Sequence, residues 1–373
     1  SVCFKRRQVS VKIMATQKNF YGHGEFHHFV GVVEDRQDPQ RLGRVRVRVV
    51  GLHTQNKEDL PTADLPWSMV ALSPTDAGIS GLGQSPSFLP EGTHVIGFFR
   101  DGDECQDPLV TGVLPGYAVE QSKNTQGFFD PNGIYPKYTQ EPDTNRLAVG
   151  NEDNPHLSLT LRKATRITGV VTADFDLTTA ADGSIVEASD ADTWDQPAIP
   201  YGAVYPYNHV YESESGHIIE IDDTQDAERL YTAHRTGTSQ EISPDGTQTN
   251  IIKGDHYNIV SGKRQALISG NADITIGGRH KIYINKDGAL NNHYDIHIGA
   301  NANINVMVET GNINLVTKQG KINVNAGGDY NVKVGGNYTL SVDGNKSETI
   351  EGSKTSNTTG AVIHRGSTID LNP

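Results

Sequence analysis

The chain has 373 residues and a formal net charge of −13, and 35% of its residues are hydrophobic. The negative charge argues against nucleic acid or an anionic membrane surface as a main partner, because like charges repel each other. The length suits two or three domains, and the low hydrophobic content predicts an elongated body with little conventional core.

The chain has two cysteines, Cys3 and Cys105, which are too few for a disulfide framework and match no metal-binding spacing. We therefore expect assembly in a reducing cytoplasm. No apolar run approaches the ~20 residues of a membrane span. Residues 1–28 are interpreted as an N-terminal extension. The first 13 are basic but lack the apolar core of a signal peptide, and Met14 is typical of a natural initiator.

Residues 29–116 predict a compact β domain. Five runs have the composition of strands: 29–36, 43–53, 67–73, 93–101 and 108–116. Five short strands with a long intervening loop suit an OB-type barrel. The loop at 78–92 is rich in glycine but lacks the lysine and following helix of a phosphate-binding loop, so we interpret it as structural.

Valine and arginine alternate in the second run: Val45, Val47 and Val49 against Arg44, Arg46 and Arg48. The alternation indicates one buried side and one side that faces solvent or a partner. An oligonucleotide-binding face is disfavoured, because the domain has few aromatic residues placed to stack bases.

Residues 117–200 are rich in proline, aspartate and threonine and have poor helical periodicity. They predict an extended connector with scattered short strands. In the next region, residues 217–222 alternate as a strand does. Four acidic residues gather there without the spacing of a calcium loop, so we interpret them as surface carboxylates at a turn: Glu220, Asp222, Asp223 and Asp226.

The most regular stretch runs from about 260 to 360, where an apolar-x-glycine triplet returns every eight residues, stretching to eight to ten in the middle. Each unit offers two apolar residues at i and i+2, which form one face of a short strand, and then a turn glycine. The clearest triplets are Val260 with Gly262, Ile268 with Gly270, Ile276 with Gly278, Val334 with Gly336, Val342 with Gly344, and Ile350 with Gly352.

Free energies decide between a lone chain and an intertwined one. Ordering eight residues costs roughly 1–2 kcal/mol each, whereas burying two aliphatic side chains returns about 1.5–3 kcal/mol apiece. Three chains wound about one axis would share an interior and pair every strand edge. We therefore predict an all-β protein in which residues 201–360 form a homotrimeric, triple-stranded β-helix, with a single-chain solenoid as the alternative.

Two groups of histidines were weighed as metal ligands. His293, Asp295 and His297 share one face of a strand, but the neighbouring isoleucines hold the interior positions, so we expect the trio to point outward. In the last stretch, 361–373, His364 is a weak candidate that would supply three imidazoles around a threefold axis. No metal, cofactor or catalytic residue is predicted.

Several motifs resemble the central spike proteins of contractile, T-even-like phage tails. In the first domain these are Asp38-Pro39, the run 42–45, the Trp67 strand, the loop 78–86, and the run 98–103 before 108–112; further along they are the runs 206–224 and 228–247. Type VI secretion spikes share the first domain and are the alternative function. They usually carry a hub domain of several hundred residues ahead of it, where this chain has about 28 residues.

The resemblance implies a trimeric spike of the virion tail baseplate, whose OB domain docks on a trimeric hub. The needle would pierce the host outer membrane on sheath contraction, with only transient contact, and would plug the tube before DNA ejection. Some spikes of this class end in an iron-binding His-x-His tip, which this sequence lacks. We therefore expect a blunt tip covered by a small PAAR-type protein that docks on Ile363, Ile369 and Leu371.

T-even spikes also carry a lysozyme between the two ends, where this chain has about 80 residues. The family's lysozyme uses a glutamate, an aspartate nine residues on, and a threonine six further. No glutamate of 117–200 has an acid nine residues on: Glu120, Glu141, Glu152 and Glu187 are followed there by Phe129, Gly150, Leu161 and Gln196. The resemblance thus implies a spike that is not an enzyme, with residual peptidoglycan hydrolysis as the alternative.

Overall fold

The computed structural model describes residues 27–85, 89–121, 133–150, 170–172, 177–179, 185–187, 192–194, 197–198, 200–284 and 293–369. The chain forms two compact units: residues 1–168 with 195–267, and residues 169–194 with 268–373. Cys3, Met14 and Leu371 lie outside the described residues. Within the described part of the chain, no helix has the length and apolar character needed to cross a membrane.

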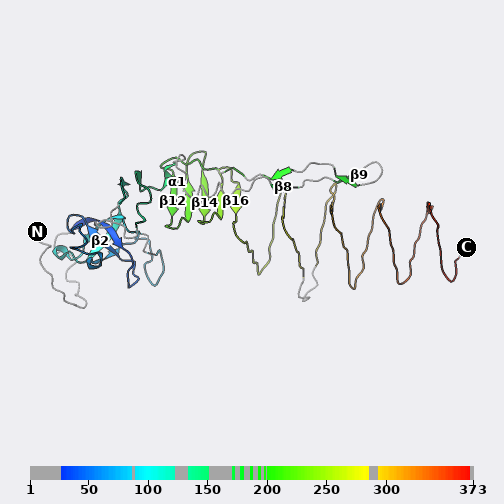
Figure 1. Cartoon of the computed structure of the whole chain (residues 1–373), viewed down its shortest axis with the longest axis horizontal. Helices are drawn as coiled ribbons and strands as arrows, with labels where there is room; N and C mark the ends of the chain where they lie inside the picture. Colours follow the sequence, from blue (N-terminus) through cyan, green and yellow to red (C-terminus); the bar gives the residue numbers. More distant parts are fainter. Residues whose placement is uncertain are drawn as a thin grey trace. The chain divides into compact units, whose positions relative to one another are not determined.

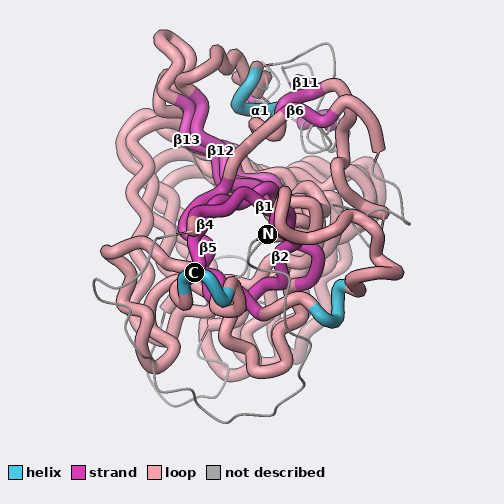
Figure 2. Tube along the Cα trace, turned by 90° about the vertical axis from the view of Figure 1, so that its left-hand side faces the viewer, coloured by secondary structure: helices cyan, strands magenta, loops and turns pink. Residues whose placement is uncertain are grey.

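The first unit begins with a closed barrel whose strand order is β1-β2-β3-β5-β4 (Figures 1 and 2). Its strands are β1 His28–Asp35, β2 Val45–Val49, β3 Trp67–Val70, β4 His94–Phe99 and β5 Pro108–Val113. Neighbours run antiparallel except β3 and β5, which are parallel. Two short 3-10 helices, Thr62–Asp64 and Gly102–Glu104, lie in the loops. The five-stranded barrel confirms the predicted OB-type fold.

The barrel core consists of the valines that alternate along its strands. Val33, Val45 and Val95 are fully buried, and the rings of Phe29 and Phe99 pack with centroids 5.1 Å apart. Gly97 lies where the register of β4 against β5 shifts, and a Cβ there would collide with the carbonyl oxygen of Leu109. The strands approach so closely at this point that only glycine fits.

The connector contains short paired elements. In the first unit, β6 Tyr117–Ala118 pairs with β7 Glu141–Pro142, and the helix α1 Arg146–Val149 follows. The Asn145 side chain caps α1 by accepting a hydrogen bond from Leu147 N (2.9 Å). In the second unit, β8 Val170–Thr172 pairs with β11 Asp192–Trp194, and β9 Leu177–Thr179 pairs with β10 Ile185–Glu187.

The first unit continues with a five-stranded antiparallel meander. Its strands are β12 Asn208–Glu212, β13 Ile218–Asp222, β14 Arg229–Ala233, β15 Ser239–Ile242 and β16 Gln248–Ile251. Leu147 of α1 covers one face, where it packs with Ile218 and Tyr231; each of the three is 2% exposed.

From 252 to 369, the described residues belong to no helix or strand, and the chain runs back and forth between sharp bends (Figure 1). The bends fall at residue pairs 261–262, 269–270, 277–278, 335–336, 343–344 and 351–352, which are the glycine positions of the repeat. The eight-residue period of the sequence is therefore also the period of the backbone.

Candidate functional site

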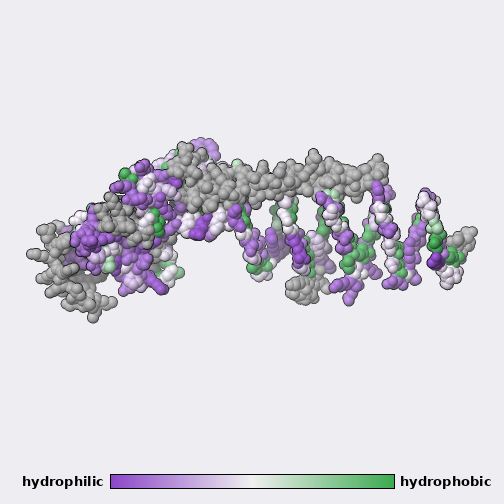
Figure 3. Space-filling model, viewed as in Figure 1, coloured by the Kyte–Doolittle hydropathy of each residue, from purple (hydrophilic) through white to green (hydrophobic). Residues whose placement is uncertain are grey.

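The repeat leaves its apolar side chains in water when a single chain is considered. Among the described residues from 252 to 369, all are exposed except Met307, which is half-buried. The six apolar residues of the clearest triplets are between 46% and 62% exposed. Figure 3 shows hydrophobic surface at several places along this part of the chain. A single chain therefore forms no hydrophobic core among the described residues from 252 to 369.

The glycines of the repeat also have open surroundings. A Cβ placed on Gly262, Gly344 or Gly352 would meet no atom within 4 Å, and none of the three has a positive φ. Within a single chain, neither backbone conformation nor close packing requires glycine at these positions.

The five-stranded sheet has an uncovered apolar face. Ile221 lies opposite Leu230, and Leu230 lies opposite Ile242, so the three form one row across β13, β14 and β15. Ile219, also on β13, points to the same side. Ile219, Ile221 and Leu230 are each about half exposed, at 53%, 48% and 49%.

The covered face of the sheet holds a buried ionic network. Arg229 hydrogen-bonds Glu220 through one terminal nitrogen and Glu241 through the other, the latter at 3.2 Å. Its Nη2 is 3.8 Å from Asp222 Oδ2, and Asn208 Nδ2 donates to Glu220 Oε1 at 2.7 Å. Glu220 and Asp222 are each 1% exposed. A buried carboxylate requires such partners, because its desolvation is costly.

The prediction that the four acidic residues lie on the surface is therefore wrong for Glu220 and Asp222. Both have the strand parity of Ile218, which faces the covered side, and Arg229 on the neighbouring strand supplies the cation that permits their burial. Asp223 and Asp226 are exposed.

The prediction that the arginine side of β2 faces solvent or a partner is wrong for Arg48. The side chains of Arg48 and Glu34 are both 0% exposed, and their two hydrogen bonds measure 2.7 and 3.0 Å. Burial raises the pKa of Glu34, but hydrogen bonds from Arg48 and Thr62 outweigh it and leave the pKa below its ordinary value. The half-buried Arg46 guanidinium lies 4.5 Å from the ring centroid of Trp67.

The Asp38 motif is a folded turn. The Asp38 carboxylate accepts hydrogen bonds from Leu42 N (2.8 Å) and Arg44 Nη2 (2.7 Å), and Gly43 has a φ of 73°. The Arg44 guanidinium holds the pKa of Asp38 well below its usual range. These residues shape the loop between β1 and β2.

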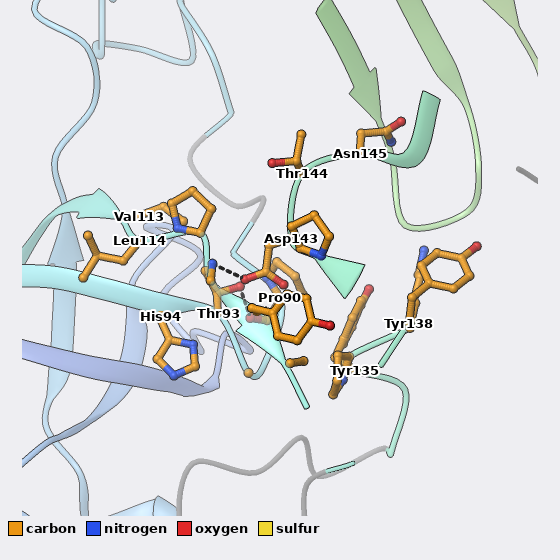
Figure 4. A pocket seen from close by; sticks show the side chains of 18 of the residues that line it. Pro90, Thr93, His94, Val113, Leu114, Tyr135, Tyr138, Asp143, Thr144 and Asn145 are labelled. Carbon is orange, nitrogen blue, oxygen red and sulfur yellow. Dashed lines mark hydrogen bonds between the residues drawn. The ribbon is translucent and has the colours of Figure 1, made fainter. Parts of the chain in front are cut away.

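A cavity of about 540 Å³ lies where the barrel meets the connector (Figure 4). His94 and Leu114 line it from the barrel, and Tyr135, Tyr138 and Asp143 line it from the connector. Next to the cavity, the Glu214 carboxylate of the β12–β13 turn accepts hydrogen bonds from Arg36 of the barrel and from Tyr135.

The histidines and tip residues considered from sequence are exposed. His293, Asp295, His297 and His364 are all at the surface, and no group of three His, Cys, Asp or Glu among the described residues is arranged to hold a metal ion. Ile363 and Ile369 are 67% and 50% exposed. Cys105 is a free, buried cysteine.

Comparisons with known proteins match two regions of the chain. Residues 51–198 match the family model of the Gp5 N-terminal OB domain, and residues 328–351 match three copies of the Gp5 C-terminal repeat. With its five-stranded barrel and its periodic C-terminal part, the chain is similar to the Gp5 proteins in both of these regions.

Two relatives show the same similarity. The chain is 39% identical over 266 residues to protein Gp5 of Vibrio phage KVP40, a match that covers 64% of this chain and 60% of the relative. It is 45% identical over 129 residues to the pre-baseplate central spike protein Gp5 of Enterobacteria phage T4, covering 33% of this chain and 22% of the relative. The chain thus spans less than two thirds of the length of either relative.

Proposed function

We propose that the chain is the structural, cell-puncturing central spike of a phage tail baseplate and that it acts as a homotrimer whose repeat forms a triple-stranded β-helix. The observation that carries the proposal is that apolar side chains recur at a regular interval along the repeat and are exposed in a single chain. Burying a valine or isoleucine yields about 1.5–3 kcal/mol. Three intertwined chains would gain about half of this free energy for each of these side chains, which are about half exposed in one chain. They would also pair the backbone groups that one chain leaves open.

The glycines support the same arrangement. A single chain gives no reason for glycine at Gly262, Gly344 or Gly352, since a Cβ there would meet nothing. Neighbouring chains that pass close to each bend would supply the reason, because a side chain would then collide with their backbone.

The uncovered row of Ile221, Leu230 and Ile242 supports self-association in the five-stranded sheet. Three copies that turn this face toward a common axis would bury it. Exposed apolar surface of this kind usually marks an interaction site.

The similarity to the central spike protein of a phage baseplate supports a position in the virion tail. The barrel would dock on a trimeric baseplate hub, and Ile363 and Ile369, with Leu371, would seat a small PAAR-type tip protein. Sheath contraction would drive the shaft through the host outer membrane. The spike would then leave the tube so that DNA passes. The proposed role is mechanical, with neither catalysis nor nucleic-acid binding.

Light scattering on the purified protein tests the trimer. We expect about three times the 40.5 kDa chain mass, and a band in sodium dodecyl sulfate that resists dissociation without boiling. A stable monomer would refute the proposal. A turbidity assay on peptidoglycan tests the mechanical role, and clearing that one carboxylate substitution abolishes would show an enzyme instead.

A further inference from the structure

We infer that Glu214 is a latch that joins the barrel to the five-stranded sheet. The contact would resist separation of these two parts of the first unit and would couple their local opening. Glu214 lies in the turn between β12 and β13. Arg36, which follows β1 of the barrel, is 178 positions away in the sequence. The mechanical meaning of this contact rests on the proposed spike function, whereas the contact itself does not.

The carboxylate of Glu214 is the meeting point of three segments. Arg36 donates two hydrogen bonds to it, from Nη1 at 2.6 Å and from Nη2 at 2.7 Å, and Tyr135 OH donates a third at 2.6 Å. Lys137 Nζ donates to the main-chain oxygen of Glu214 at 3.1 Å. Barrel, connector and sheet are therefore tied at one residue.

The geometry distinguishes this contact from an ordinary surface ion pair. A planar guanidinium that meets a carboxylate with two parallel hydrogen bonds is among the strongest side-chain contacts. Arg36 Nε also lies 3.5 Å from Glu91, whose side chain is 6% exposed, so Arg36 is held from a second side. Networks of this kind contribute where isolated surface pairs do not.

The turn itself does not need a glutamate. Its backbone closes through a hydrogen bond from Gly216 N to Ser213 O (2.9 Å), and the same bond closes the turns 234–237 and 243–246. The residues that correspond to Glu214 in those turns are Arg235 and Pro244. Since a basic residue and a proline serve equally well there, we assign the acid at 214 to the contact with the barrel.

The electrostatics agree with a permanent contact. The hydrogen bonds from Arg36 lower the pKa of Glu214 to about 2, with further lowering by Tyr135 and Lys137. The carboxylate therefore stays ionised throughout the physiological range, so the negative charge that Arg36 binds is always present.

The test is amide hydrogen exchange on the full-length protein in four forms: wild type, Glu214→Gln, Arg36→Gln and the double variant. We expect either single change to speed exchange about tenfold or more on both sides of the contact, in the turn 213–217 and in the barrel segments around 36 and 91–93. The double variant should be no faster than the singles, because each of them already opens the latch.

Glu228→Gln is the matched control. Glu228 is an exposed carboxylate in another turn of the same sheet, so its change removes the same charge without touching the contact. We expect it to leave exchange unchanged. The inference is overturned if Glu214→Gln speeds exchange only within its own turn, or if the two single effects add.

Light scattering on the same samples keeps this result separate from the proposed function. A trimeric mass in all variants with no change in barrel exchange would overturn the latch alone. A monomeric wild type in which both sides still respond would support the latch and refute the trimer.

Discussion

The proposed shaft predicts that the same substitution has different effects at two neighbouring positions of the repeat. Val342 and Ser341 are neighbours, and successive side chains of an extended chain point to opposite sides. We compare Val342→Asn with Ser341→Asn, so that the same amide side chain is placed on the proposed inner face or on the outer face of the shaft.

The expected loss of trimer stability follows from the exposure of the Val342 side chain, which is 46% in one chain. Losing the burial of about half a valine removes about 1 kcal/mol per chain, or about 3 kcal/mol in a trimer. An amide buried without partners costs about 1–3 kcal/mol per chain in addition. The inner substitution should therefore destabilise the trimer by roughly 6–12 kcal/mol, and the outer one by less than about 1 kcal/mol.

The assay is thermal dissociation of the trimer, followed by loss of the detergent-resistant band and by light scattering. We expect Val342→Asn to lower the dissociation temperature strongly and Ser341→Asn to leave it nearly unchanged. Equal effects of the two variants would refute the reasoning, since they would show that residues 341 and 342 have the same surroundings.

Three further predictions concern the barrel. Arg48→Met leaves the buried carboxylate of Glu34 without its cation, so we expect a loss of about 3–5 kcal/mol in urea unfolding, much of it recovered when Glu34→Gln is added; an unchanged midpoint would contradict this. Burial, with a smaller effect from the Arg48 charge, lowers the pKa of His53 from 6.5 to about 4. The unfolded chain therefore binds a proton at His53 at a higher pH than the folded chain does. The free energy of unfolding should fall by roughly 2–3 kcal/mol as the pH drops from 6.5 to 4. The variant His53→Gln should lack this pH dependence. Asp38→Asn should cost about 1–3 kcal/mol in the same urea assay, because the turn loses its charged bond to Arg44, and an unaffected midpoint would argue against that role.

The strands of the barrel were predictable because their apolar residues alternate and their ends carry turn residues. Val45, Val47 and Val49 define the inward side of β2 without further information. The bends of the repeat were predictable for a similar reason, since a glycine at a fixed interval is a local signal. These features depend on residues that are close together in the sequence.

The buried charges could not be predicted in this way. Arg48 and Asp222 are charged residues of the kind that usually lie on the solvated side of a strand. Only the fold reveals that Glu34 lies against Arg48 and that Arg229 lies against Asp222. An alternation of acidic residues with isoleucine, as at 218–222, was the available signal. It gives the sides of the strand but not which side is covered. Glu214 left no signal, because its partner is distant in the sequence.

The exposed valines and isoleucines of the repeat have a consequence for biosynthesis. The barrel has an internal core and can fold as each chain leaves the ribosome, at a rate that does not depend on concentration. A shaft built from three chains must instead wait for two more copies, and until then its apolar side chains invite aggregation. Yield should therefore depend on how trimer assembly competes with aggregation, and any delay in assembly leaves more chains with exposed apolar side chains.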